Sequence, residues 1–180
     1  MKDLNTLLNQ LPGSWNDVSL GMFQKLSSTR IREINDDFDG IENTLAVISK
    51  LTDTSIEDLE EMAMKDLQQL GSKLSFMVDL PARTKASVKE WKTPEEISYN
   101  DYVTFIKIEP DKQLENLGLF VKNFSKTKLT QDEIEALSLP DVLTGFFLQR
   151  KALIKSMKRL MKSAKLTGEK KAKAEKKHQV

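Results

Sequence analysis

Apolar residues that recur every three or four positions are the feature that most constrains the fold of this chain. One such stripe consists of Ile31, Ile34, Phe38, Ile41, Leu45 and Ile48. Two shorter stripes consist of Leu67, Leu70, Leu74 and Met77, and of Leu114, Leu117, Phe120, Val121 and Phe124. An α-helix has about 3.6 residues per turn, so each stripe places its apolar side chains on one helical face. The sequence therefore predicts a mainly all-α protein.

The same order of features occurs twice along the chain, which suggests an internal duplication. The first copy opens at Trp15 and the second at Trp91, and each is followed by a serine placed to cap a helix, Ser19 or Ser98. Farther along, two sequences typical of a capping box begin 75 residues apart, at Ser55 and Thr130. We predict two similar helical modules in tandem. The alternative is chance similarity between helical segments of like composition.

These patterns divide the chain into five predicted parts. They are an N-terminal segment (1–14), a first helical module (15–80), a linker (81–94), a second helical module (95–149), and a basic helix with a Lys-rich tail (150–180). The linker is predicted because residues 79–94 carry two prolines and few apolar residues. Within it, residues 85–91 have room for one short strand.

The last predicted helix combines an apolar seam with a basic face. The seam alternates four and three like a heptad, through Leu143, Phe146, Arg150, Leu153, Met157, Leu160 and Ala164. It predicts either packing on the chain's own body or a contact with another chain, including a homo-oligomer. The basic residues gather on another side of the helix, at Lys151, Lys155, Lys158, Arg159, Lys162 and Lys165.

Charge is divided along the chain, although the net charge is only +1. From Arg150 onward, twelve Lys or Arg residues stand against two Glu, a net of +10. The other 16 basic and 25 acidic residues give residues 1–149 a net of −9. Such asymmetry is typical of an interaction tail on a folded body, and the alternative is a tail that folds back on its own acidic body.

The basic region is compatible with more than one kind of partner. Its lysines can contact the phosphates of a nucleic acid or an acidic protein surface. No aromatic residues interleave these lysines, so base stacking is not supported. A solvated face without a partner is the third alternative.

The residues needed for most catalytic and metal sites are missing or isolated. The chain has no cysteine, and its one histidine, His178, lies in the Lys-rich tail without fixed neighbours. Residues 35–40 resemble the start of a calcium loop, but Glu42 and Ala46 stand where an apolar residue and a glutamate are needed. The glycines form no phosphate-binding run. We therefore predict no enzyme, no cofactor, no metal site and no small-molecule substrate.

The sequence also lacks the features of a membrane or secreted protein. No stretch approaches the roughly 20 apolar residues that a membrane span requires. The N-terminus has no basic-then-apolar signal, and the absence of cysteine suits folding in the cytosol. We expect no membrane association.

The two openings of the form Ser/Thr-x-x-x-aromatic, followed by Ile- and Leu-rich helices, resemble small accessory proteins of tailed bacteriophages. Residues 18–26, 45–51 and 56–67 are similar to tail-assembly chaperones and tail-associated structural proteins. The resemblance covers roughly residues 15–148, and the Lys-rich end departs from it. Such families have no catalytic residues to carry over, so the resemblance implies binding and assembly, in the virion or the host cytoplasm.

We therefore predict a structural or assembly protein of a tailed phage particle, associated with the tail, that binds other virion or assembly proteins. The alternative function is nucleic-acid binding through the basic C-terminal region. The candidate partner-binding residues are Trp15, Phe23, Trp91, Tyr102, Lys155, Lys158, Arg159 and Lys162. For the four aromatic residues, the alternative role is packing in the core.

Overall fold

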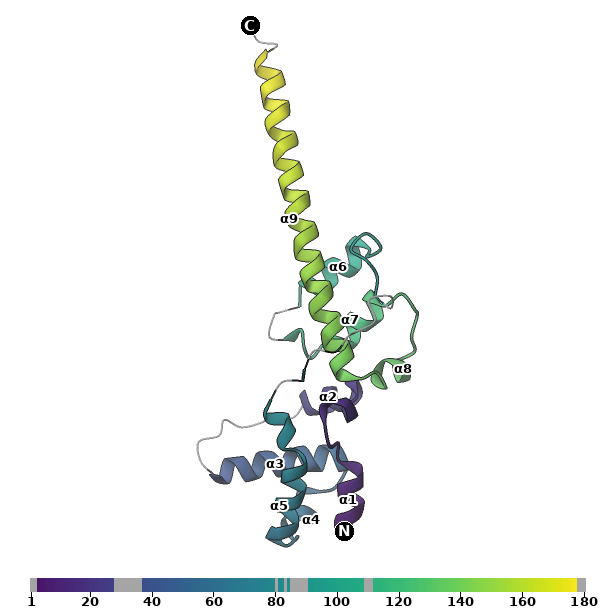
Figure 1. Ribbon diagram of the computed structural model, residues 1–180, viewed down its shortest axis with the longest axis vertical. Coiled ribbons are helices and arrows are strands. Elements are labelled where there is room, and N and C mark those ends of the chain that lie inside the picture. The colour runs from purple at the N-terminus through teal and green to yellow at the C-terminus, as the bar shows by residue number, and fades with distance from the viewer. Residues whose placement is uncertain are drawn as a thin grey trace.

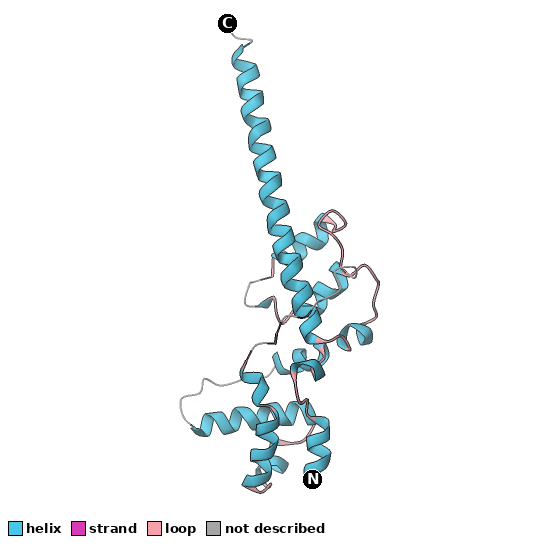
Figure 2. Cartoon of the chain, in the orientation of Figure 1, coloured by secondary structure: helices cyan, strands magenta, loops and turns pink. Residues whose placement is uncertain are grey.

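The computed structural model describes residues 3–27, 37–79, 81–82, 84, 91–108 and 112–177. The prediction of an all-α fold is confirmed (Figure 2). Within the described ranges, extended pairing is limited to two isolated bridges, Ser19 with Ser138 and Trp91 with Ser125. The short strand predicted at residues 85–91 lies outside the described residues, except for the single bridge that Trp91 makes.

The helices follow one another in two series (Figure 1). The first series is α1 (Leu4–Gln10), the 3-10 turn η1 (Trp15–Asp17), α2 (Leu20–Ser27), α3 (Asp37–Thr52), α4 (Ile56–Glu60), α5 (Met64–Lys73) and η2 (Ser75–Val78). The second series is α6 (Tyr99–Ile106), α7 (Leu117–Phe124), α8 (Gln131–Glu135) and α9 (Leu139–Lys177).

Capping hydrogen bonds explain where these helices begin, and the predicted caps are confirmed. The hydroxyl of Ser55 accepts from the amide of Asp58, and that of Ser98 accepts from the amide of Asp101. Thr130 forms a complete capping box with Glu133. Ser19 accepts from the amide of Met22 just ahead of α2. Each cap satisfies an amide of the first turn that has no partner within its own helix.

Backbone hydrogen bonds repeat between the two series at an offset of 75 residues. In the first series Leu59 donates to Ser55, Glu61 to Glu57, Met62 to Leu59 and Leu67 to Ala63. In the second, Ile134 donates to Thr130, Ala136 to Asp132, Leu137 to Ile134 and Val142 to Ser138. The turn from α4 into α5 is thus built like the turn from α8 into α9. We call these two turns the α4–α5 corner and the α8–α9 corner.

The buried side chains form two clusters that divide the chain differently from the predicted modules. The N-terminal cluster, from α1, α3, α4 and α5, contains Leu7, Leu11, Leu45, Ile48, Leu59, Leu70 and Leu74. The aromatic cluster contains Val18, Leu20, Trp91, Phe105, Leu117, Phe120, Val121, Phe124, Ile134, Leu139, Val142, Phe146 and Leu153. So α1, from the predicted segment 1–14, packs with the first module, while residues 18–20 pack with the second.

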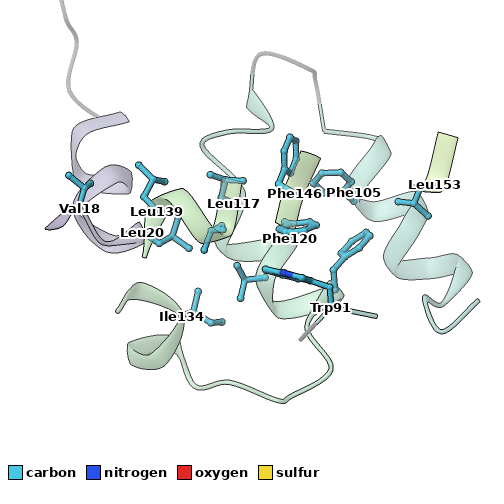
Figure 3. Close-up of a cluster of buried hydrophobic side chains, with 13 residues drawn as sticks. Val18, Leu20, Trp91, Phe105, Leu117, Phe120, Ile134, Leu139, Phe146 and Leu153 are labelled. Atoms are coloured by element: carbon cyan, nitrogen blue, oxygen red, sulfur yellow. The ribbon is translucent and has the colours of Figure 1, made fainter. Parts of the chain in front are cut away.

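The start of α2 joins the aromatic cluster because its backbone pairs with the α8–α9 corner. The amide of Leu20 donates to the carbonyl of Leu137 at 2.8 Å, and the amide of Leu139 donates to the carbonyl of Val18 at 3.0 Å. In Figure 3, Val18, Leu20 and Leu139 lie together at one end of the aromatic cluster. Leu20 and Leu139 have no exposed surface.

Stacked rings form the other end of the aromatic cluster (Figure 3). Phe120 stacks on Trp91 and on Phe124, each with ring centroids 5.0 Å apart, and meets Phe146 edge-on at 5.4 Å. Gly145 of α9 lies directly against the indole of Trp91, where a Cβ atom would overlap the ring. This glycine therefore sets how closely α9 approaches the stacked rings.

The long helix α9 leaves the aromatic cluster and projects away from the body, and the N-terminal cluster lies at the opposite end of the molecule (Figure 1). Its 39 residues correspond to about 58 Å. Phe146 and Leu153 of the predicted seam are buried, and the hydroxyl of Tyr102 donates to the sulfur of Met157. The seam therefore packs on the chain's own body as far as Met157. The side chains of Leu160 and Ala164 lie outside the described residues.

Two glycines in helices offer a matched test of this packing. We expect Gly145→Ala to lower the free energy of unfolding by about 1–3 kcal/mol, because the new methyl group overpacks against Trp91. Gly40→Ala in α3 meets no atom within 4 Å and should raise it by up to about 1 kcal/mol through helix propensity. Urea unfolding measures both values. Equal effects of the two variants would contradict the close contact between α9 and Trp91.

Candidate partner-binding site

An apolar groove lies where η1 and α2 meet the first turns of α9. We call it the junction groove; its volume is about 350 Å³. It is lined by Trp15, Phe23, Pro81, Ala82, Leu114, Leu139, Pro140, Leu143, Thr144 and Phe147. Among the described lining residues, Thr144 carries a hydroxyl, which donates to the carbonyl of Pro140, and Trp15 carries an indole N–H. Such walls favour an apolar occupant.

Trp15 is held in place at one wall of the junction groove. Its indole N–H donates to the carbonyl of Asp79 at 2.8 Å, and its ring meets Phe76 edge-on at 5.3 Å. Phe76 packs against both the N-terminal and the aromatic clusters. Trp15 therefore connects the N-terminal cluster with the aromatic cluster through Phe76. Because Trp15 is only half-buried, part of its surface also lines the groove.

Phe147 of α9 presents an exposed apolar side chain at the junction groove. Its side chain is 43% exposed, whereas that of its neighbour Phe146 is 2% exposed and lies in the aromatic cluster. Successive residues of a helix point about 100° apart, so these two rings face different sides of α9. Leu114, also at the groove, is 39% exposed. Exposed apolar side chains around a hollow are typical of a binding surface.

The predicted site residues fall into four places. Trp15 and Phe23 lie together at the junction groove. Trp91 is 8% exposed and stacked on Phe120, so it packs in the core and presents no binding face. Tyr102 is half-buried between α6 and α9, where it lines a smaller hollow of about 220 Å³. The predicted basic residues are exposed on α9.

The basic residues form a strip that continues from the junction groove along α9. Between residues 150 and 162 there are six basic residues and no acidic one, and all six are exposed: Arg150, Lys151, Lys155, Lys158, Arg159 and Lys162. At about 100° per residue, Phe147, Lys151, Ile154 and Lys158 lie along one side of the helix. Ile154 is 46% exposed. We call this surface the basic strip.

Sequence reasoning missed Leu114, Leu143 and Phe147 as groove residues. The helical spacing placed Leu143 and Phe146 in the apolar seam, so it predicted correctly that Phe146 faces the core. It did not show that Leu143 and the adjacent Phe147 line a groove, because that groove depends on η1 and α2 packing beside α9, a contact between residues far apart in the sequence. The one usable signal was a second large apolar residue directly beside a seam position.

Three exposed carboxyl groups have shifted pKa values, and each accepts a hydrogen bond from a nearby backbone amide. The amides of Thr6, Thr93 and Thr130 lower the pKa of Asp3, Glu96 and Glu133, respectively. Lowering favours the charged form, the opposite of what a general acid needs near neutral pH. These carboxylates stabilise local turns and helix starts by accepting hydrogen bonds from backbone amides.

Two further properties concern the described part of the chain. No three of its His, Cys, Asp or Glu side chains gather closely enough to hold a metal ion. None of its helices is both long and apolar enough to cross a membrane.

The different environments of the two tryptophans can be measured directly. We expect acrylamide to quench the fluorescence of Trp91→Phe, which keeps the half-buried Trp15, more strongly than that of Trp15→Phe, which keeps the buried Trp91. The same titration on the unfolded variants provides the control, since both indoles are then exposed to the quencher. Equal quenching of the two folded variants would contradict the described burial.

Comparison with known proteins gives no relative: no protein-family model, curated protein or solved structure matches the chain.

Proposed function

We propose that this chain is a non-enzymatic structural or assembly protein of a tailed phage particle, associated with the tail, that binds another virion protein. The observation that carries the proposal is the junction groove, which is apolar and continuous with the basic strip. The phage context comes from the resemblance of residues 15–148 to tail accessory proteins.

The occupant we propose is an acidic polypeptide segment that carries a large apolar side chain. The walls of the groove, including Trp15, Phe23 and Phe147, offer contact to an apolar anchor. Beyond the groove, a bound segment that follows α9 meets six basic side chains and no acidic one. Charge complementarity along this path favours acidic residues beside the anchor.

The groove and the strip would contribute in different ways. Burial of one large apolar side chain stabilises a complex by about 1.5–3 kcal/mol. An exposed ion pair typically contributes about 0.2–1 kcal/mol and weakens as salt increases. The anchor would therefore set most of the affinity, while the basic strip would speed association and orient the segment.

Nucleic-acid binding is the second candidate, and the basic strip favours it because phosphates fit the same charge. That function would not need the junction groove. Its affinity would fall steeply with salt, because each phosphate contact releases a counterion. Substitutions in the groove therefore separate the two candidates.

A pair of neighbouring residues on α9 provides the test. Phe147 lines the groove and is 43% exposed, while Leu148 is 45% exposed and does not line it. We expect Phe147→Asp to weaken capture of the virion partner at least about tenfold, since an apolar anchor loses its contact. Leu148→Asp should leave capture unchanged. The measurement is a nuclease-treated pull-down of virion proteins with the full-length chain, followed by titration of the captured protein.

The outcomes distinguish the two candidates. Capture of an acidic virion protein that is lost only in Phe147→Asp supports the proposal. Equal capture of the partner by both variants would contradict a role of the junction groove in binding. The second candidate would be favoured if the chain retains nucleic acid when nuclease is left out and if the double variant Lys155→Glu/Lys158→Glu, with the groove unchanged, no longer retains it.

A further inference from the structure

One contact inside the molecule is formed by two elements, and each of these elements has a structural counterpart elsewhere in the chain. In the contact that forms, the start of α2 lies on the α8–α9 corner, and Ser19 bridges Ser138. The amide of Leu20 donates to Leu137, and the amide of Leu139 donates to Val18. Both donors lie in the first turn of a helix, where amides have no partner within their own helix. Pairing and burial therefore occur together at this contact.

The start of α6 has the local structure of the start of α2. Ser98 accepts from the amide of Asp101 at 3.0 Å, as Ser19 accepts from the amide of Met22 at 3.2 Å. The amide of Tyr102 donates to the carbonyl of Ser98, as Phe23 donates to Ser19, at 3.0 Å in both cases. Ile97 and Tyr99 therefore occupy the positions that Val18 and Leu20 occupy in the first series.

The α4–α5 corner has the local structure of the α8–α9 corner, since the four backbone hydrogen bonds described above repeat at an offset of 75 residues. By the same offset, Met62 and Met64 stand where Leu137 and Leu139 stand. Both halves of the contact thus exist a second time in the chain.

The two counterparts are exposed where the originals are buried. Leu20 and Leu139 are 0% exposed, whereas Tyr99 is 82% exposed and Met64 is 58% exposed. Figure 1 shows why they do not meet: α6 and the α4–α5 corner lie at opposite ends of the body. One molecule cannot bring them together, but two molecules can.

We propose that a second copy of the chain completes this contact, with α6 of one molecule on the α4–α5 corner of the next. The amide of Tyr99 would donate to the carbonyl of Met62, and the amide of Met64 would donate to the carbonyl of Ile97. Because the two surfaces differ, the association is head-to-tail and builds a ring or an open chain. Neither surface belongs to the junction groove, so this inference and the proposed function can fail separately.

One position changes the fit of the second contact. Gly21 approaches Glu135 so closely that an added Cβ atom would lie 3.0 Å from the Cβ of Glu135. The counterparts are Asn100 and Glu60. With Asn100 in place of glycine, α6 and the α4 of the other molecule must lie a few tenths of an ångström farther apart. The side-chain amide of Asn100 can then donate to the carboxylate of Glu60.

Two substitutions test the contact without disturbing the helices. Met64 and Tyr99 are the first residues of α5 and α6, where an aspartate is favourable to the helix. We expect the full-length chain to associate with increasing concentration in analytical ultracentrifugation. Met64→Asp and Tyr99→Asp should each raise the dissociation constant at least about tenfold and give monomers. Val78→Asp, at a side chain that is 89% exposed elsewhere, is the control and should associate normally.

Mixing the two variants tests the head-to-tail arrangement itself. Met64→Asp keeps an intact α6 surface, and Tyr99→Asp keeps an intact corner, so an equimolar mixture should form a 1:1 dimer and nothing larger. Circular dichroism and urea unfolding confirm that both variants are folded. A monomeric wild-type chain, association that survives either variant, or a mixture that stays monomeric would each overturn the proposal.

Discussion

The contact between the start of α2 and the α8–α9 corner brings the beginning of the first helical series into the aromatic cluster. It joins the first and the second series of helices through two backbone hydrogen bonds, at Leu20 and Leu139, and buries both side chains completely. Burial of two leucines contributes about 3–6 kcal/mol, and each hydrogen bond adds about 1 kcal/mol. Without it, η1 and α2 would have no place against α9, and the junction groove would have no second wall.

The aromatic cluster then determines what α9 presents to a partner. Gly145 lets the helix lie directly on Trp91, and this close approach sets the rotation of the helix about its axis. With that rotation, Phe146 enters the core and Phe147 faces the junction groove. The exposed basic side chains beyond the groove follow from the same rotation, since they lie on the continuation of one rigid helix. One core contact thus orients both parts of the proposed binding surface.

The duplicated local structure explains how the same chain can offer a second kind of surface. A helix start with free first-turn amides and a corner with a free carbonyl are complementary by their backbone chemistry. The described residues contain a counterpart of each element, and the internal contact uses one pair. The exposed Tyr99 and Met64 mark the other pair. The junction groove depends on side chains that have no counterpart at that second contact. Partner binding and self-association therefore use different residues and different kinds of contact.

Local patterns in the sequence predict the all-α fold, several capped helix starts and the charge division. They do not predict α1 (Leu4–Gln10), and they do not fix how the helices pack. Apolar spacing and the caps at Ser55, Ser98 and Thr130 act within one or two turns, so they can be read without knowing the fold. Much of the candidate site could not be read in this way. Whether Trp15 or Trp91 is buried, and which side of α9 is free, depends on burial between residues far apart in the chain. Leu20 and Leu137 show this most clearly. Their backbone hydrogen bond places the start of α2 in the aromatic cluster, and no local sequence pattern predicts that pairing.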